Sequence, residues 1–309
     1  MIHIQHPNST KLLVTLAVGE QFLLDWQQWL KSGWEIYAKK HGYDIVVFTE
    51  VLDNSSRAQQ RSISWQKCLI LNQAICQQYQ RVVWVDSDVL INPSAPCIAE
   101  QVPLDKVGAT DAYSFISKTM HDYLYECYID YCKKRNKQLV INPTAASYYQ
   151  NFGIDTDLNE VIQAGILVLN PIKHRSILNK VYEDYEEKYD AELDYAYNYE
   201  MRPLSYEIVK RDLHYFIDQR FNFILNNYMY LAYPFLCHTE NFLTQNHVQQ
   251  EVEQWMRLAV TSAYSHAYFL HFAGGAYWKS LIKYVNLAFQ NPTDFDLLTQ
   301  LKDISSNAQ

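Results

Sequence analysis

Arg81-Val82-Val83-Trp84-Val85-Asp86-Ser87-Asp88-Val89-Leu90-Ile91 is the stretch that decides the fold. Its apolar residues 82–85 follow one another without a polar interruption, which is typical of a strand buried on both faces of a sheet. Two carboxylates, Asp86 and Asp88, then follow with a spacing that places both on one side of an extended chain. Neighbouring buried carboxylates repel unless positive charge lies between them, and divalent cations prefer carboxylate oxygens. The stretch therefore indicates a metal site, or alternatively an Asx-rich turn that ends the strand.

The sequence before this stretch predicts a strand at residues 11–18, a helix at 21–40 and a second strand at 43–49. This order indicates a βαβ unit and a parallel sheet. In open α/β sheets, ligands bind beyond the carboxyl ends of the strands, where Asp86, Asp88 and the residues after Val18 all lie. This shared position favours the metal site over the turn.

The rest of the chain continues to alternate between helical and extended patterns, so the predicted fold class is α/β. One predicted helix, at residues 174–199, is acidic, and its Glu183, Asp184, Glu186 and Glu187 are expected to form a solvated face. The other predicted helices are at 64–79, 120–132 and 280–289, and the other predicted strands are at 107–110, 161–169 and 267–272.

Composition limits the possible partners. The 309 residues are 49% hydrophobic and 19% charged, which is typical of a globular protein. The formal net charge is -8 and no long Lys/Arg block occurs, so nucleic acid is not expected as a partner. The 25 Tyr and 7 Trp provide amphipathic rings that suit sugars, although many of them must be core.

Cysteine usage and the N-terminus indicate a cytoplasmic location. The cysteines show no CxxC spacing and are interpreted as reduced, buried side chains. The N-terminal residues lack a basic region followed by an apolar one, and no apolar run reaches the length of a transmembrane segment. The six cysteines are Cys68, Cys76, Cys97, Cys127, Cys132 and Cys237.

Two later stretches carry further candidate residues. In His271-Phe272-Ala273-Gly274-Gly275-Ala276-Tyr277-Trp278-Lys279, the histidine is a candidate metal ligand, the glycines allow close approach of a ligand, and Lys279 is a candidate partner for a diphosphate. The alternatives are a structural histidine and a surface lysine. In Gln163-Ala164-Gly165, the glycine inside an apolar strand indicates either close approach of a ligand or tight strand packing.

Taken together, these motifs resemble nucleotide-sugar-dependent glycosyltransferases of the GT-A fold. The retaining glycogenin-like and galactomannan-galactosyltransferase-like branches are the most similar. The resemblance covers residues 12–279 and depends on the following motifs in order: Thr15-Leu16-Ala17-Val18-Gly19, then Ser64, Trp65 and Lys67, then Asp86-Ser87-Asp88, then Gln163-Ala164-Gly165-Ile166-Leu167-Val168-Leu169-Asn170-Pro171, and finally His271 with its glycines.

This resemblance implies a single GT-A domain over 1–309 with a Rossmann-like, mixed but mainly parallel central sheet. Residues 11–108 would form the nucleotide-sugar-binding half, 109–290 the acceptor-binding half and 292–309 a polar tail. The implied activity is metal-dependent transfer of a sugar, with retention, from a nucleotide diphosphate donor, UDP-sugar being expected. The acceptor would be a glycan, a protein or a small molecule.

The resemblance also implies roles for individual residues. Asp86, Asp88 and His271 would bind Mn2+ (or Mg2+), and Asp86, Asp88 and Gln163 would act at the reacting groups. Two departures from the family pattern concern Gln163, where the family usually has Asn or Asp, and Lys279, which follows the histidine less closely than usual. The implied donor-binding residues are Thr15, Ala17, Val18, Lys67, Asp86, Ser87, Ala164, Gly165, Gly274 and Lys279.

No residue stands out from the sequence as a nucleophile. Asp155, Asp157 and Asp218 are carboxylates that an active site of this kind would accommodate near the sugar. Glu207 and Asn222 would either shape the acceptor side or serve as hydrogen-bonded structural residues. Two other functions remain open: a non-catalytic sugar-nucleotide or glycan-binding protein, and an aspartate-nucleophile phosphatase. The phosphatase pattern fits less well, because Val89-Leu90 stands where that class usually has small hydroxyl residues.

Overall fold

The protein is built around a seven-stranded sheet with the strand order β1-β3-β2-β4-β7-β6-β10. The structure is a computed structural model that describes residues 1–115, 117–134, 142, 144–190, 195–238, 249–274 and 276–285. Strands β2, β3, β4, β6 and β10 point the same way, and β1 and β7 run against them. The predicted α/β class with a mixed, mainly parallel sheet is therefore confirmed. The strands are β1 (Ile2–Ile4), β2 (Lys11–Leu16), β3 (Tyr43–Phe48), β4 (Arg81–Val85), β6 (Val107–Asp111), β7 (Ile162–Leu169) and β10 (His214–Phe216).

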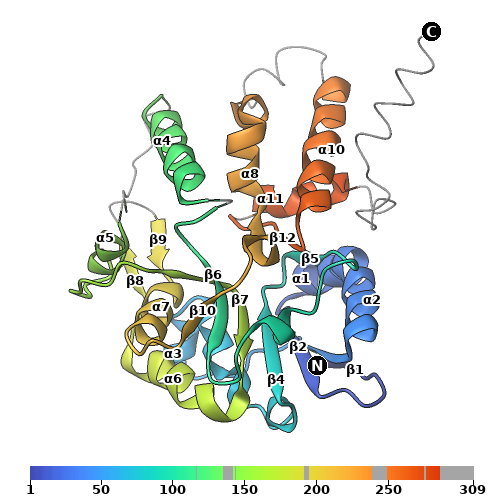
Figure 1. Cartoon of the computed structure of the whole chain (residues 1–309), viewed down its shortest axis with the longest axis vertical. Coiled ribbons are helices and arrows are strands. Elements are labelled where there is room, and N and C mark those ends of the chain that lie inside the picture. Colours follow the sequence, from blue (N-terminus) through green and yellow to red (C-terminus); the bar gives the residue numbers. More distant parts are fainter. Residues whose placement is uncertain are drawn as a thin grey trace.

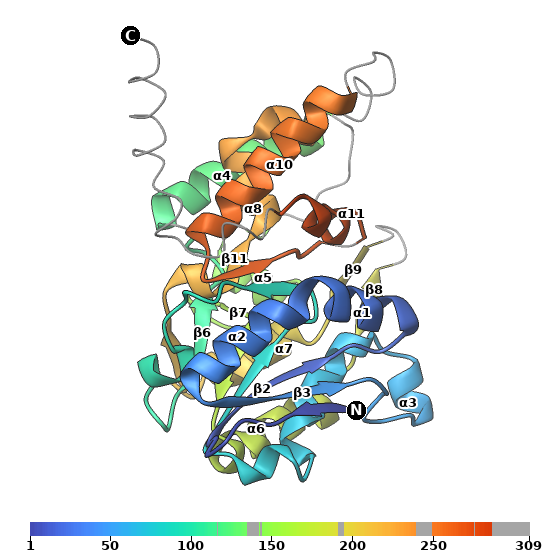
Figure 2. The ribbon, with the colours of Figure 1, turned by 90° about the vertical axis from the view of Figure 1, so that its right-hand side faces the viewer.

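Helices cover both faces of this sheet (Figures 1 and 2). Alternate residues of β4 point to opposite sides, so that Val83 and Val85 join one apolar core and Val82 and Trp84 join the other. The first core packs under a π-helical turn (Trp26–Leu30) and α2 (Lys31–His41). Both follow α1 (Glu20–Asp25), which has no buried residue, in a region where one helix was predicted. The second core lies under α6 (Pro171–Asp184), α7 (Met201–Val209) and a 3₁₀-helix, η2 (Ile63–Asn72).

Two predicted helices differ from the structure. Residues 64–79 form η2 and a short second 3₁₀-helix (Cys76–Gln78). Trp65, Cys68 and Leu71 of η2 are fully buried, and three-residue spacing aligns side chains in a 3₁₀-helix. The predicted helix at 174–199 is wrong, because α6 already begins at Pro171, capped by Asn170, and ends at Asp184. Two short strands follow α6, β8 (Lys188–Asp190) and β9 (Tyr195–Asn198).

A second, three-stranded sheet lies beside the first and has the order β11-β12-β5. It consists of β5 (Val89–Ile91), β11 (Phe223–Ile224) and β12 (Phe269–His271). Helices α4, α8 and α10 stand on the same side of the molecule as this sheet (Figure 1). The remaining helices are α3 (Ser56–Gln59), α4 (Lys118–Lys134), α5 (Ala145–Gln150), α8 (Leu225–Ala232), α10 (Gln249–His266) and α11 (Ala276–Ser280).

The described residues also bear on the predictions about cysteines and membrane segments. Cys68, Cys76 and Cys97 are buried free thiols, as predicted, whereas the free thiols Cys127 and Cys237 are only partly buried. Within the described ranges, no helix combines the length and the apolar composition needed to cross a membrane. The predicted polar tail at 292–309 and the end of the predicted helix at 280–289 lie outside the described residues.

Candidate functional site

The Asp86-Ser87-Asp88 segment carries the chain from one sheet to the other. Strand β4 is buried along its whole length and ends directly before Asp86, whose N–H donates to Gly165 O at 2.9 Å. A tight turn follows, closed by the N–H of Val89 on Asp86 O at 3.2 Å. The N–H of Phe272 donates to Asp88 O at 3.0 Å. These backbone bonds tie both aspartates to the segments that carry Gly165 and His271.

His271 lies against both carboxylates because β12 pairs with β5, with His271 opposite Val89. Its Nε2 lies 3.2 Å from Asp88 Oδ1 and 3.8 Å from Asp86 Oδ2. One ligand atom from each of the three residues lies within 4.8 Å of the other two. Two carboxylate oxygens and one imidazole nitrogen form a donor set that suits Mn2+, and the structure thus brings together all three predicted metal ligands.

Asn222 orients the imidazole ring. Its Oδ1 lies 2.7 Å from His271 Nδ1, and its Nδ2 donates to Thr110 Oγ1 at 3.4 Å. Because the amide is fixed by Thr110, its carbonyl accepts a hydrogen bond from the Nδ1–H group. This leaves Nε2 facing the aspartates, which is the usual arrangement of a metal-binding histidine. Of the two roles left open for Asn222 in the sequence, the structure supports the hydrogen-bonded structural one.

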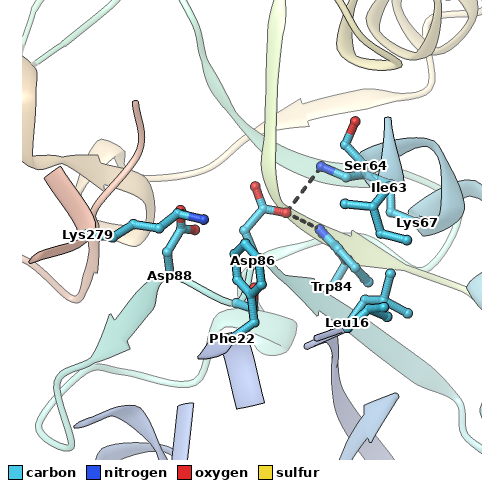
Figure 3. A pocket seen from close by; sticks show the side chains of 11 residues that line it. Leu16, Phe22, Ile63, Ser64, Lys67, Trp84, Asp86, Asp88 and Lys279 are labelled. Atoms are coloured by element: carbon cyan, nitrogen blue, oxygen red, sulfur yellow. Dashed lines mark hydrogen bonds and ion pairs between the residues drawn. The ribbon is translucent and has the colours of Figure 1, made fainter. Parts of the chain in front are cut away.

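Lys67 provides a buried positive charge behind Asp86. Its Nζ lies 3.1 Å from Asp86 Oδ1 and 2.8 Å from Glu200 Oε1, and it also donates to Ala164 O at 3.2 Å. The Trp84 indole N–H donates to the same Asp86 oxygen at 2.7 Å. Both contacts to Asp86 are drawn in Figure 3. Asp86 Oδ1 is therefore held by the protein, while Oδ2 faces His271.

Glu200 and Trp84 were not identified as site residues from the sequence. Glu200 is buried at the start of α7, far along the chain from its partner Lys67. Trp84 could have been found, since it stands at i-2 from Asp86 on the same side of the strand.

The pKa values of these groups follow from burial and opposing charge. Burial raises the pKa of Asp86, and the nearby Lys67 and His271 offset only part of this effect. Burial acts in the same direction on Asp88, but the charges of His271 and Lys279 hold its pKa well below the ordinary value. Burial alone would lower the pKa of His271, yet the Asp88 and Asp86 carboxylates raise it. The site therefore favours a positive charge between the two aspartates.

A pocket of about 180 Å³ opens in front of the aspartates (Figure 3). Lys279 lines it and lies 3.4 Å from Asp88 Oδ2 through Nζ, which also stands 4.4 Å from the centre of the Phe22 ring. The opposite wall is mainly apolar. The described residues of the lining are Leu16, Val18, Phe22, Ile63, Ser64, Lys67, Trp84, Asp86, Ser87, Asp88 and Lys279.

The structure brings only some of the other predicted donor-binding residues to this pocket. Val18 and Ser87 line it, whereas the side chains of Thr15 and Ala17 are buried beneath it. The N–H of Ala17 is already bonded to Phe48 O at 2.8 Å. Thr15 Oγ1 has no hydrogen-bond partner among the described residues. Gly274, at φ 105°, lines a different cavity.

The glycine in the Gln163-Ala164-Gly165 stretch is explained by packing. A Cβ on Gly165 would lie 2.5 Å from His271 Cε1 and 2.8 Å from His271 Nδ1. The pairing of β7 with β6 also changes register, from Gly108 opposite Val168 to Thr110 opposite Gln163, so Gly165 lies in an irregular part of this pairing. Ala164 O binds Lys67, and Gln163 Oε1 accepts from the Gly165 N–H at 3.2 Å. Of the two interpretations of the glycine, tight packing is the one that the structure shows.

The remaining candidate carboxylates have other contacts or face solvent. Asp218 caps the 3₁₀-helix η5 (Gln219–Asn222) and pairs with Arg220 at 2.6 Å. Glu207 is buried and bonds the Tyr185 hydroxyl and Arg211. Asp155 and Asp157 are exposed.

Comparison with known proteins finds resemblance only among solved structures. No protein-family model and no curated protein sequence matches the chain. The first similar structure is a glycosyltransferase involved in the glycosylation of the major capsid of PBCV-1, at 15% identity and a TM-score of 0.47, covering 89% of this chain and 99% of that one. The second is the bifunctional glycosyltransferase WbbM, at 16% identity and a TM-score of 0.47, covering 91% of this chain and 50% of that one.

A third similar structure is the galactosyltransferase LgtC in complex with donor and acceptor sugar analogues. Its identity to this chain is 14% and the TM-score is 0.41, with 89% of this chain and 96% of that chain covered. All three TM-scores lie below 0.5, so these similarities do not indicate the function of this chain.

Proposed function

We propose that the protein is a GT-A-type glycosyltransferase that uses a divalent cation to transfer a sugar from a nucleoside-diphosphate donor. The observation that carries this proposal is the convergence of Asp86, Asp88 and His271, with both aspartates lining a pocket that also contains Lys279. The proposed donor is a UDP-sugar and the proposed cation is Mn2+, with Mg2+ as the alternative. The acceptor is a glycan, a protein or a small molecule.

The charge balance of the site supports a diphosphate ligand. The carboxylates of Asp86, Asp88 and Glu200 outnumber the ammonium groups of Lys67 and Lys279 by one when His271 is neutral. A divalent cation reverses this balance and leaves a net positive charge in front of the pocket. Such a site attracts two phosphates, and a bound cation would neutralise charge that develops on the diphosphate as the glycosidic bond breaks.

The apolar wall of the pocket supports a nucleoside at the other end of the donor. Leu16, Val18 and Phe22 come from the end of β2 and the start of α1, and Ile63 comes from η2. In Figure 3, Leu16 and Ile63 lie on the side of the pocket away from Asp88, and Phe22 lies between the two halves. A flat base would pack against this wall while its phosphates reached the charged end.

Retention of configuration is the proposed stereochemical outcome. The carboxylates among the described lining residues of the pocket are Asp86 and Asp88, and both face His271 or a lysine. Neither is placed as a separate nucleophile. We therefore expect the acceptor hydroxyl to attack on the same face from which the diphosphate leaves.

The decisive test is release of the nucleotide from a panel of UDP-sugars, with Mn2+ and with a chelator. Asp88→Asn keeps the size of the side chain but removes one charged ligand, so we expect release to fall about 10²–10³-fold. Asp155→Asn, an exposed control, should leave release unchanged. Wild-type turnover in Asp88→Asn would contradict the metal assignment. Glycan binding without turnover of any donor would favour a non-catalytic binding protein, and metal-dependent hydrolysis of phosphate monoesters would favour a phosphatase.

A further inference from the structure

A second cavity lies among α4, α8 and α11 and has a volume of about 320 Å³. This volume lies near the lower end of the roughly 300–1,000 Å³ that is usual for small-molecule sites. The rings of Tyr125, Tyr230 and Trp278 and the amides of Asn226 and Asn227 supply most of its described lining. Tyr230 and Trp278 meet edge to face, with ring centres 5.8 Å apart.

This cavity is directly connected to the metal-ligand cluster through three short pieces of chain. Trp278 lines the cavity while the next residue, Lys279, reaches Asp88. Asn222 holds His271, and Asn226 enters the cavity from the first turn of α8, the helix that begins just after β11. Gly274 packs against both Trp278 and Asn226. A Cβ at this position would lie 2.8 Å from Trp278 and 3.1 Å from the Asn226 amide nitrogen. A molecule in the cavity would therefore lie next to the donor site.

One polar atom of a residue that lines the cavity lacks a partner. Asn226 Oδ1 is buried and has no hydrogen bond among the described residues. A buried amide oxygen of this kind is normally paired, and a ligand that donates a hydrogen bond would satisfy it. A hydroxyl group does so and can also accept from the amide N–H of the same residue.

The described lining residues favour a neutral ligand. They include no Lys, Arg, Asp or Glu. The histidine of the lining is His121. Burial lowers its pKa below the ordinary value of 6.5, so that its ring is neutral at pH 7. A phosphorylated or carboxylated ligand would find no counter-charge here.

We propose that this cavity binds a neutral pyranose unit of the acceptor, with Trp278 as the stacking platform and Asn226 as a hydroxyl partner. A pyranose ring has an apolar face of C–H groups that packs on an aromatic ring and a rim of hydroxyls that suits amides. The assignment rests on the proposed transferase function. In the transfer, the acceptor oxygen bonds to the anomeric carbon, the bond from that carbon to the phosphate oxygen breaks, and the nucleoside diphosphate leaves with the hydroxyl proton.

Binding is tested without turnover, by the change in tryptophan fluorescence on addition of methyl α- and β-pyranosides of glucose, galactose and mannose. Trp278→Phe and Trp255→Phe each remove one tryptophan, and Trp255 on α10 is half exposed and lines no part of the cavity. We expect the fluorescence change to disappear in Trp278→Phe and to persist in Trp255→Phe. Asn226→Ser serves as a second variant that leaves the aromatic packing intact.

Transfer kinetics then test the acceptor role. With the best glycoside as acceptor, Trp278→Phe and Asn226→Ser should each raise the acceptor KM about tenfold more than the UDP-sugar KM. The proposal is overturned if no glycoside changes the wild-type fluorescence, or if the change survives in Trp278→Phe. Glycoside binding at Trp278 without Mn2+-dependent donor hydrolysis would overturn the transferase function and with it the acceptor role. Normal donor hydrolysis with an unchanged acceptor KM in both variants would overturn the acceptor role alone.

Discussion

Gly165 has two separate reasons to lack a side chain. It lies where the pairing of β7 with β6 is irregular, and the ring of His271 occupies the position of its missing Cβ. Its carbonyl also accepts the backbone N–H of Asp86. This residue therefore sets the distance between the strand that carries one aspartate and the strand that carries the histidine.

Gly165→Ala should displace the imidazole and weaken Mn2+ binding about tenfold, because second-layer changes around metal-binding histidines have effects of this size. Gly108→Ala is a matched control in the neighbouring strand β6. Its Cβ would also collide with a side chain, at 2.4 Å from Val102 Cγ2, but away from the metal ligands.

Both alanine variants should lose about 1–3 kcal/mol of unfolding free energy. In calorimetric titration with Mn2+, only Gly165→Ala should show the weaker affinity. Equal Mn2+ affinities in the two variants would show that the contact between Gly165 and His271 does not orient the ligand.

Site residues could be predicted from the sequence where the pattern that marks them lies within one short stretch of the chain. Asp86 and Asp88 were predicted because their spacing on a buried strand is visible in eleven residues. Asn222 and Glu200 act through His271 and Lys67, and those pairs form only when distant segments fold together. A single sequence contains no information on which distant residues are neighbours.

At the scale of elements, the segment after α6 replaces most of the helix predicted at 174–199. Glu186 and Glu187 lie beyond the end of α6 and contact residues at or just before the start of η2. The Glu186 side chain stays exposed, as predicted, whereas Glu187 is only partly exposed. Glu186 pairs with the buried Arg61 at 2.7 Å. Glu187 Oε2 accepts from the Ser62 N–H at 2.6 Å and from the Trp65 indole N–H at 2.9 Å. The acidic pattern was read as a solvated helix face because its partners lie more than a hundred residues away in the chain.

Glu187→Ala should reduce the unfolding free energy by about 1–3 kcal/mol, since it leaves the buried Trp65 N–H without its acceptor. Glu183→Ala removes a carboxylate whose side chain is 67% exposed and pairs with Arg57, so its effect should stay within about 0.5 kcal/mol. Urea unfolding of both variants measures the difference. Similar small losses in both would mean that the Glu187 contacts do not stabilise η2.

At the scale of the whole molecule, four histidines of the described residues have pKa values below the ordinary 6.5, and burial is the first cause in each. They are His41, His121, His174 and His266. In His174, a hydrogen bond also requires the neutral ring, because its Nδ1 accepts from the Asn170 N–H at 3.0 Å. His271 is the exception, since its neighbouring carboxylates raise its pKa.

The protein should therefore lose stability as the pH falls below 6.5. A histidine with a lowered pKa in the folded state is protonated first in the unfolded chain, so its contribution is present above pH 6.5 and is lost as the pH falls towards the folded-state value. Thermal unfolding between pH 8 and pH 5 measures this loss. His174→Gln should weaken the pH dependence, and an unchanged pH profile in that variant would exclude His174 as one of its sources.

The larger architecture was more predictable than its details. The β2-α2-β3 order and the buried strand β4 follow from local patterns of apolar residues, and the structure confirms them. The separation of β5, β11 and β12 into a second sheet was not predicted, because these strands are two or three residues long and pair across the chain. Short strands carry too few residues for a periodic signal.

That second sheet would give a bound cation a structural role in addition to the proposed chemical one. Asp86 follows directly from the seven-stranded sheet, whereas Asp88 leads into β5 and His271 ends β12 of the three-stranded sheet. A cation held by all three residues would cross-link the two sheets at the point where the chain passes from one to the other. Binding of the cation would then couple the two sheets into one cooperative unit. Loss of the cation would allow the two sheets to move separately.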